Sequence, residues 1–208
     1  MFAGKTLWDF LQMGLYTMTV LLICSIVSLT FILERAYNIR SKNRVKRPGF
    51  MLKIKSYIDN NSLQGAVTYA GSIISPLARI VQAGLLLMGK NEEKITNAME
   101  RQISIEVKDL EKYTGIIGSI GSTVVYIGLF GTVLGIIKAF QDIASAAGSG
   151  TGITGVVAGI AEALITTASG IAVAVPTVIA YNTIMNKIDA MSTDMEICAS
   201  ETLDLLRK

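Results

Sequence analysis

The sequence contains no histidine and only two cysteines among its 208 residues. Histidine is the commonest metal ligand and general base, so its absence argues against metal-dependent and triad catalysis. Cys24 lies in an apolar segment and Cys198 in a polar one, which favours two unpaired thiols over a disulfide or a metal site. We therefore expect a protein that is not an enzyme and that binds no cofactor or metal.

Three long segments contain at most one charged residue each. Two of them, Phe10 to Leu33 and Thr114 to Ile137, carry no charged residue, and in the third, Ile143 to Asn186, Glu162 is the single charge. The 24 residues from Thr114 to Ile137 would cover roughly 36 Å as a helix, enough for a hydrocarbon core of about 30 Å. With 51% hydrophobic residues and a mean hydropathy of +0.51, the chain fits an all-α membrane protein with three transmembrane helices.

A signal peptide is the alternative interpretation of the first apolar segment. Its apolar region would be shorter and would be followed by a small-residue cleavage site, whereas Phe31 to Arg35 offers none. A retained first transmembrane helix is therefore favoured.

The basic residues predict the orientation. Between the first two spans, Glu34 to Lys112 contains 14 Lys or Arg and 8 Asp or Glu, and the cluster Arg40 to Arg47 directly follows the first span. By the positive-inside rule this cluster lies in the cytoplasm, so the N-terminus and the turn after the second span lie outside and the C-terminus inside. The position of the cluster beside a span favours anionic lipids, or no specific ligand, over nucleic acid.

The region between the first two spans is long enough to fold. Pro48 and Pro76 separate a short helix around Leu52 to Ile58 from a second that begins near Leu77.

Asn91 followed by two glutamates predicts an N-cap with acids in the first helical turn. After it, apolar residues recur at helical spacing, and we expect this helix to run unbroken into the second span, to about Ala144. The tail also predicts a helix that continues the third span, because a heptad seam is formed by Ile184, Ile188, Met191, Met195, Cys198, Thr202 and Leu205. The second and third helices would thus extend into a cytoplasmic helical stalk.

The second and third spans meet across the short turn Ser145 to Gly152, as a membrane hairpin. If the apex is at 149 and 150, residues whose numbers add to about 299 share a depth. Thr132 then lies opposite Thr167, where their hydroxyls would replace the hydrogen bonds that water offers to an ion or to a carboxylic acid. Alternatively, the two threonines merely bond to carbonyls of their own helices.

Glu162 is the first functional candidate, because an acid inside an apolar run costs a few kcal/mol of desolvation. Lys138 is expected at a similar depth, and we hypothesise that the two side chains form an ion pair. Small residues in the second and third spans predict close helix packing. Close packing explains the glycines whether or not the helices also form a pore. The predicted packing positions are Gly128, Gly131, Gly135, Gly155, Gly159, Ala163 and Gly170, with Pro176 expected to bend the third span.

Several motifs resemble the MotA/TolQ/ExbB family of bacterial proton-channel and energy-transducer subunits, most closely its ExbB and TolQ branch. The matching stretches are Tyr126 to Val133 with Gly135 in the second span, Gly159 to Leu164 with Thr167, Gly170, Pro176 and Tyr181-Asn182 in the third, and more weakly Glu34-Arg35 and Ser75 to Ala78. The family usually has proline where this chain has Val125.

The resemblance implies a pentamer in the bacterial inner membrane, and with the orientation predicted from charge its N-terminus would be periplasmic and its C-terminus cytoplasmic. It implies an ExbD- or TolR-like single-span partner whose membrane aspartate carries the ion, and a TonB- or TolA-like effector. Thr132, Glu162 and Thr167 match polar residues that line the family's ion path. At 100° per residue Thr167 lies about 140° around the helix from Glu162 and Thr166 about 40°, so Thr166 is a second-tier candidate.

The predicted organisation is 1–34 for the N-terminus and first transmembrane helix, 35–112 for a cytoplasmic helical region, 113–186 for the hairpin and 187–208 for a cytoplasmic C-terminal helix. The leading hypothesis is a subunit that couples ion flow to mechanical work on an outer-membrane or envelope system. A small self-contained transporter would be expected to show internal repeats and broken helices, which the sequence lacks. A structural membrane scaffold would tolerate replacement of Glu162.

Overall fold

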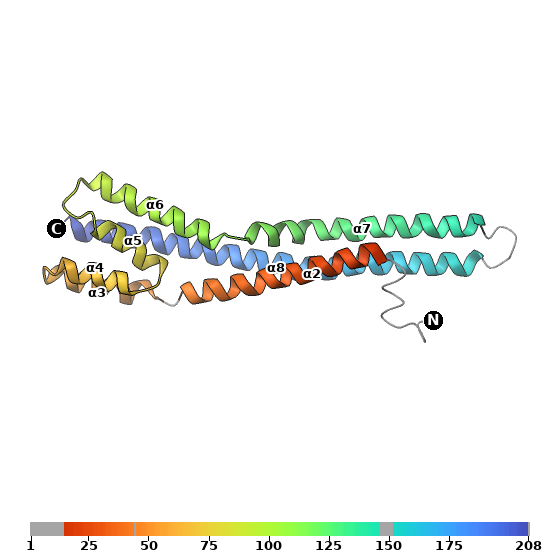
Figure 1. Cartoon of the computed structure of the whole chain (residues 1–208), viewed down its shortest axis with the longest axis horizontal. Helices are drawn as coiled ribbons and strands as arrows, with labels where there is room; N and C mark the ends of the chain where they lie inside the picture. The colour runs from red at the N-terminus through yellow and green to blue at the C-terminus, as the bar shows by residue number, and fades with distance from the viewer. Residues whose placement is uncertain (1–14, 44, 146–151, 208) are drawn as a thin grey trace. The chain divides into compact units, whose positions relative to one another are not determined.

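The computed structural model describes residues 15–43, 45–145 and 152–207. The predicted turn apex at 149 and 150, and the start of the first apolar segment, lie outside this range. Within it the chain is helical and contains no strand. The helices are α2 (Leu15–Lys42), α3 (Arg47–Asp59), α4 (Leu63–Ser72), α5 (Pro76–Leu85), α6 (Glu92–Leu110), α7 (Thr114–Ser145) and α8 (Gly152–Leu206) (Figure 1).

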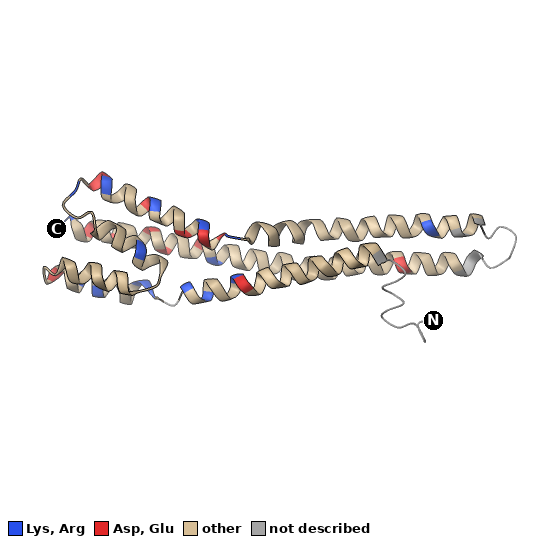
Figure 2. Cartoon of the chain, viewed as in Figure 1, with Lys and Arg blue, Asp and Glu red and all other residues tan. Residues whose placement is uncertain are grey.

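Three of these helices, α2, α7 and α8, are long and apolar enough to cross a membrane, which confirms the predicted fold class. The chain divides into two compact units. Unit 1 comprises the chain up to Leu33 together with Tyr113–Asn182, and unit 2 comprises Glu34–Lys112 and Thr183–Lys208. Charged residues lie mainly on the helices of unit 2, whereas α7 and the first part of α8 carry few (Figure 2).

Unit 1 is held together by contacts among α2, α7 and α8. Leu21, Val124 and Ala174, one from each helix, form a common buried core. The hydroxyls of Ser28 on α2 and Thr177 on α8 lie 3.4 Å apart in the interior. Buried polar groups that meet each other in this way avoid the cost of facing hydrocarbon alone.

Unit 2 is a small bundle in which α5 and α6 begin where the sequence predicts, whereas α3 begins at Arg47, before the predicted start near Leu52. Pro48 and Pro76 lie in the first turns of α3 and α5, where the missing N–H costs nothing. The Asn91 side chain accepts a hydrogen bond from the Glu93 N–H, which confirms the predicted N-cap of α6. Helix α4 was not predicted, because its buried residues, Ala66 and Ala70, are too small to mark an apolar stripe.

The last part of α8 packs by the predicted heptad seam. All its members are buried except Leu205, which is half-buried. This part of α8 packs against α3. The Cys198 sulfur of α8 lies 3.3 Å from the Met51 sulfur of α3, and Arg47 of α3 donates a hydrogen bond to Glu201 of α8 at 2.5 Å. The predicted continuation of the third apolar segment as a long helix is confirmed.

The predicted unbroken helix from Asn91 to Ala144 is wrong: α6 ends at Leu110 and α7 begins at Thr114. In a continuous helix the carbonyls of Asp109 and Leu110 would accept from the N–H groups four residues on. Here the Arg35 guanidinium donates to both, at 3.1 and 3.5 Å. Tyr113 has a φ of 65°, a left-handed conformation that ends the helical path.

Helix α2 also extends further than the first apolar segment, through Glu34 to Lys42. Its buried positions Leu21, Ser28 and Arg35 recur every seven residues, and Ile39 follows one turn later. The helix therefore continues because it keeps a packed face after its apolar run has ended.

Candidate functional site

The packing of α7 against α8 defines the candidate site in unit 1. A methyl group added at Gly128 would lie 3.1 Å from the Thr166 carbonyl oxygen and 3.2 Å from Gly170 Cα. One added at Gly170 would lie 3.0 Å from the Val124 carbonyl oxygen. Because these neighbours are backbone atoms, they cannot swing away, and the two helices approach this closely only where both lack side chains.

The contacts between the two helices follow the register expected from the turn. A Cβ on Gly135 would meet the Cβ of Ala163 at 2.9 Å, and one on Gly159 would meet that of Ala139 at the same distance. Towards the other end, Gly121 lies against Val178. Gly155 differs, because a Cβ there would meet no described atom within 4 Å. Its packing role, like the bend at Pro176, stays a prediction.

Thr167 bonds across the helix pair. Its hydroxyl is half-buried and donates to the Gly128 carbonyl of α7 at 3.2 Å. Thr132, also half-buried, donates to the Leu129 carbonyl within α7. The alternative of an own-helix bond therefore describes Thr132 but not Thr167. After this donation, the oxygen of each hydroxyl can still accept a hydrogen bond.

Thr166 is the most buried of the five candidates, with 2% of its surface exposed. Its hydroxyl donates to the Glu162 carbonyl at 3.1 Å, and its methyl faces Gly131. A Cβ on Gly131 would also lie 3.2 Å from the Thr17 hydroxyl of α2. Thr166 and Thr167 thus have different neighbours, as their angular separation requires.

The two charged candidates differ in exposure. The Glu162 side chain is half-buried on α8, one turn before Thr166, while Lys138 is exposed on α7. The ion pair between them stays a prediction. Among the described residues, no group of three or more Cys, Asp or Glu is placed to hold a metal ion.

Sequence reasoning missed two polar residues that are almost fully buried in unit 2. Arg35 is 2% exposed and caps α6, and Glu106 is 1% exposed and accepts from Arg79 at 2.9 Å. Both lie in phase with the buried face of their helices, seven residues after Ser28 and Met99 respectively. A search for polar residues in phase with the apolar face would have found them.

Two exposed acids of unit 2 are held in their charged form by neighbours. The hydrogen bond from Lys42 lowers the pKa of Asp109, and that from Arg207 lowers the pKa of Glu92. An acid whose pKa is lowered in the folded state contributes to the stability of the fold at a pH above its ordinary pKa. This contribution is lost as the pH falls through the lowered pKa. Both contacts therefore contribute fully at neutral pH.

Three spanning helices, with glycine-lined contact between two of them, define a multi-pass helical membrane protein. The model of the MotA/TolQ/ExbB proton channel family matches residues 72–197, and the chain belongs to this family. The family is described as one of proton channels and not as a class of enzymes.

Three relatives illustrate the match. The chain is 33% identical over 117 residues to the biopolymer transport protein ExbB of Pseudomonas putida, covering 56% of this chain and 35% of the relative. It is 44% identical over 90 residues to the Tol-Pal system protein TolQ of Pseudomonas aeruginosa, covering 43% and 38%. It is 30% identical over 168 residues to ExbB of Salmonella typhimurium, covering 78% and 68%. The chain thus spans less than half the length of the first two relatives.

Proposed function

We propose that this chain is the ion-conducting subunit of an inner-membrane motor that couples the proton motive force to work on an outer-membrane transport or envelope system. The family description supports a proton channel, and relatives with names from biopolymer transport and the Tol-Pal system support the coupling role. The ion is a proton in this proposal.

The observation that carries the proposal is the hydrogen bond from Thr167 to Gly128 across a glycine-lined contact. It fixes a hydroxyl at the α7–α8 seam in the middle of two apolar segments, and Thr132 is half-buried on α7 one turn beyond Gly128. A carboxylic acid that releases and takes up a proton in an apolar region needs such hydroxyls as donors and acceptors.

The chain has no aspartate in its second and third apolar segments from Thr114 to Ile137 and from Ile143 to Asn186, so the acid would come from a partner. We propose a homo-oligomer, a pentamer, around ExbD- or TolR-like helices that carry an intramembrane aspartate. A TonB- or TolA-like effector would receive the work. Glu162 and Thr166 would supply polar groups on the neighbouring face of α8.

Thr132→Val and Thr167→Val test this path, because valine keeps the shape of threonine and removes its hydroxyl. We expect each variant to assemble with its partner but to lose most energy-dependent activity in cells. Complex formation would be measured by co-purification and activity by growth that depends on the transport system. Thr123→Val is the matched control, because Thr123 is an exposed threonine of the same α7.

Glu162→Ala and Glu162→Gln complete the series. Both should reduce activity if charge is needed, and only the alanine variant should do so if a hydrogen-bonding group is enough. Full activity of both valine variants and of Glu162→Ala would contradict the channel and favour a scaffold. Loss of activity in Thr123→Val would show that the effect is not specific to the threonines of the proposed path.

A further inference from the structure

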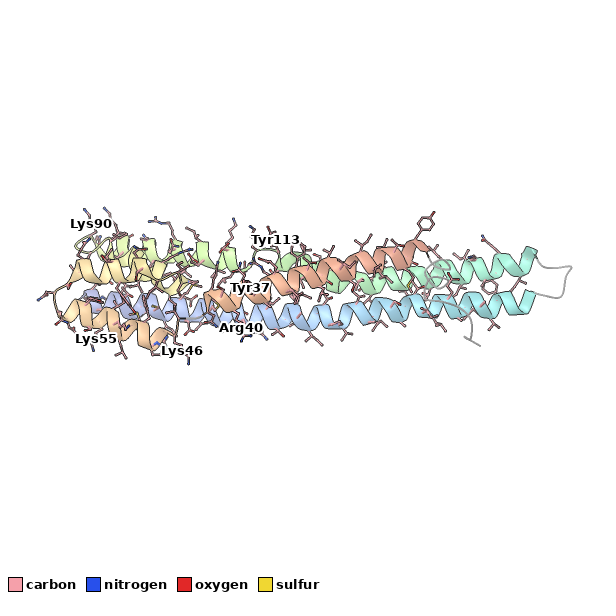
Figure 3. All side chains as sticks on the ribbon, turned by 60° about the horizontal axis from the view of Figure 1, so that its bottom comes forward. Tyr37, Arg40, Lys46, Lys55, Lys90 and Tyr113 are labelled. Atoms are coloured by element: carbon pink, nitrogen blue, oxygen red, sulfur yellow. The ribbon has the colours of Figure 1, made fainter. Side chains whose placement is uncertain are left out.

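A shallow groove of about 490 Å³ lies between α2 and α8 in unit 2. It is lined by Ala36, Tyr37, Ile39, Arg40, Asn43 and Lys187. Tyr37 and Arg40 project from the same stretch of α2 (Figure 3). Two cations from separate helices thus flank a partly apolar floor.

The cations of this groove have no acidic partner in the part of the chain that the structure describes. Among the described residues, Arg40 and Lys187 form no ion pair, and both are exposed. By contrast, Lys42 is paired with Asp109 and Arg47 with Glu201, so part of the basic cluster after the first span serves internal contacts. The groove therefore presents two positive charges that are available to an anion.

The groove lies where two apolar segments end. The apolar run of α2 ends at Leu33, a turn before Tyr37, and that of α8 ends at Asn186, directly before Lys187. Residues at such ends lie at the level of the lipid headgroups. Tyr37 is 76% exposed, and a tyrosine at this level places its ring among the glycerol groups and its hydroxyl in water.

We propose that this groove binds the headgroup of an anionic phospholipid. Arg40 and Lys187 bind the phosphate from two sides, and the Asn43 amide is within the same lining to donate to the polar headgroup. Ala36 and Ile39 provide an apolar floor for the start of an acyl chain. The inference rests on the membrane spans and not on ion conduction, so it would survive failure of the threonine test.

A lipid fits better than a soluble anion for a physical reason. Free phosphate would be fully hydrated and would gain nothing from an apolar floor or an exposed tyrosine. A phospholipid gains from both and is already at the required depth, so little freedom is lost on binding.

Native mass spectrometry of the full chain in a neutral detergent tests the site, with dioleoylphosphatidylglycerol and dioleoylphosphatidylcholine as probes. Wild type should bind phosphatidylglycerol more tightly than phosphatidylcholine. Arg40→Gln/Lys187→Gln should weaken phosphatidylglycerol binding roughly 25-fold, because each basic residue near an anionic headgroup contributes about a factor of five. Phosphatidylcholine binding should be unchanged.

The matched control is Lys90→Gln/Arg101→Gln, which removes one Lys and one Arg that are exposed in unit 2 outside the groove. It should leave the lipid preference intact. Circular dichroism should show that both double variants keep wild-type helicity. Equal binding of the two lipids, equal losses in both double variants, or displacement of the lipid by millimolar inorganic phosphate would overturn the proposal.

Discussion

At the scale of single residues, Glu106 is the side chain whose burial most needs an explanation. Its Oε1 accepts from Arg79 and from Gln102, each at 2.9 Å. Its Oε2 is buried and has no hydrogen-bond partner among the described residues. A buried carboxylate is costly unless paired, so the contact from Arg79 of α5 offsets the cost of placing this acid inside α6.

Arg79→Gln should therefore destabilise the protein by about 1 to 2 kcal/mol. The value is below that of a fully buried pair, because the Arg79 side chain is 52% exposed and water screens it. Thermal unfolding of the purified protein followed by circular dichroism would measure the change. Adding Glu106→Gln should restore part of the loss, since the uncompensated charge is removed.

Arg101→Gln is the control for that experiment, because it removes an exposed cation from α6 itself. A loss of stability in Arg101→Gln as large as in Arg79→Gln would assign the effect to net charge. No change in Arg79→Gln would mean that Glu106 is satisfied without it.

At the scale of helices, glycines decide how α7 and α8 meet. In lipid, apolar side chains gain nothing from escaping water, so association depends on close packing and shared polar groups. Gly128 and Gly170 each face backbone atoms of the other helix, and the Thr167 hydroxyl crosses the same contact. Packing and the proposed ion path thus depend on one seam.

Gly170→Ala should separate the helices, because the new methyl would lie 3.0 Å from a carbonyl oxygen and 3.1 Å from Gly128 Cα. Overpacking of this kind costs about 1 to 3 kcal/mol, and we expect a lower melting temperature. Gly115→Ala is the control on α7, because a Cβ there meets nothing within 4 Å. Alanine is also the better helix former, so Gly115→Ala should not destabilise. A melting temperature of Gly170→Ala at or above that of Gly115→Ala would refute the close contact.

The sequence predicted those features of the helices that depend on local patterns. Apolar length identified the three spans, Asn91 with its glutamates identified a helix start, and the heptad seam identified the buried face of the tail. The break after Leu110 was not predictable in this way, because it depends on Arg35, which is 74 residues away from Asp109 in the chain. Helical spacing continues through the break and therefore conceals it.

The candidate site was predictable in part for the same reason. The position of the turn in the sequence predicted the register that brings Gly135 to Ala163. It did not predict the hydrogen-bond partners of the Thr132 and Thr167 hydroxyls. That partner depends on side-chain rotation, and Thr167 turns to α7 while Thr132 bonds within its own helix.

At the scale of the whole molecule, the distribution of charge predicts the orientation of the chain in the membrane. Basic residues outnumber acidic ones by 14 to 8 between the first two spans, and the turn between the second and third spans has none from Ser145 to Gly152. The positive-inside rule predicts that the basic region lies in the cytoplasm. If this orientation is right, the lipid proposed to bind at Arg40 and Lys187 comes from the cytoplasmic leaflet.

Single cysteines at two positions test this orientation, after replacement of the two native ones by alanine as Cys24→Ala and Cys198→Ala. A maleimide that does not cross membranes should label Ser149→Cys in whole cells after the outer membrane is permeabilised. It should label Lys46→Cys only after the inner membrane is opened as well, because the positive-inside rule predicts a cytoplasmic basic cluster. Lys90→Cys is a second reporter and should follow Lys46→Cys, since both lie between the same two spans. The opposite pattern would place the C-terminus outside. It would contradict the orientation on which the proposed coupling depends and would move the lipid site from the cytoplasmic to the outer leaflet.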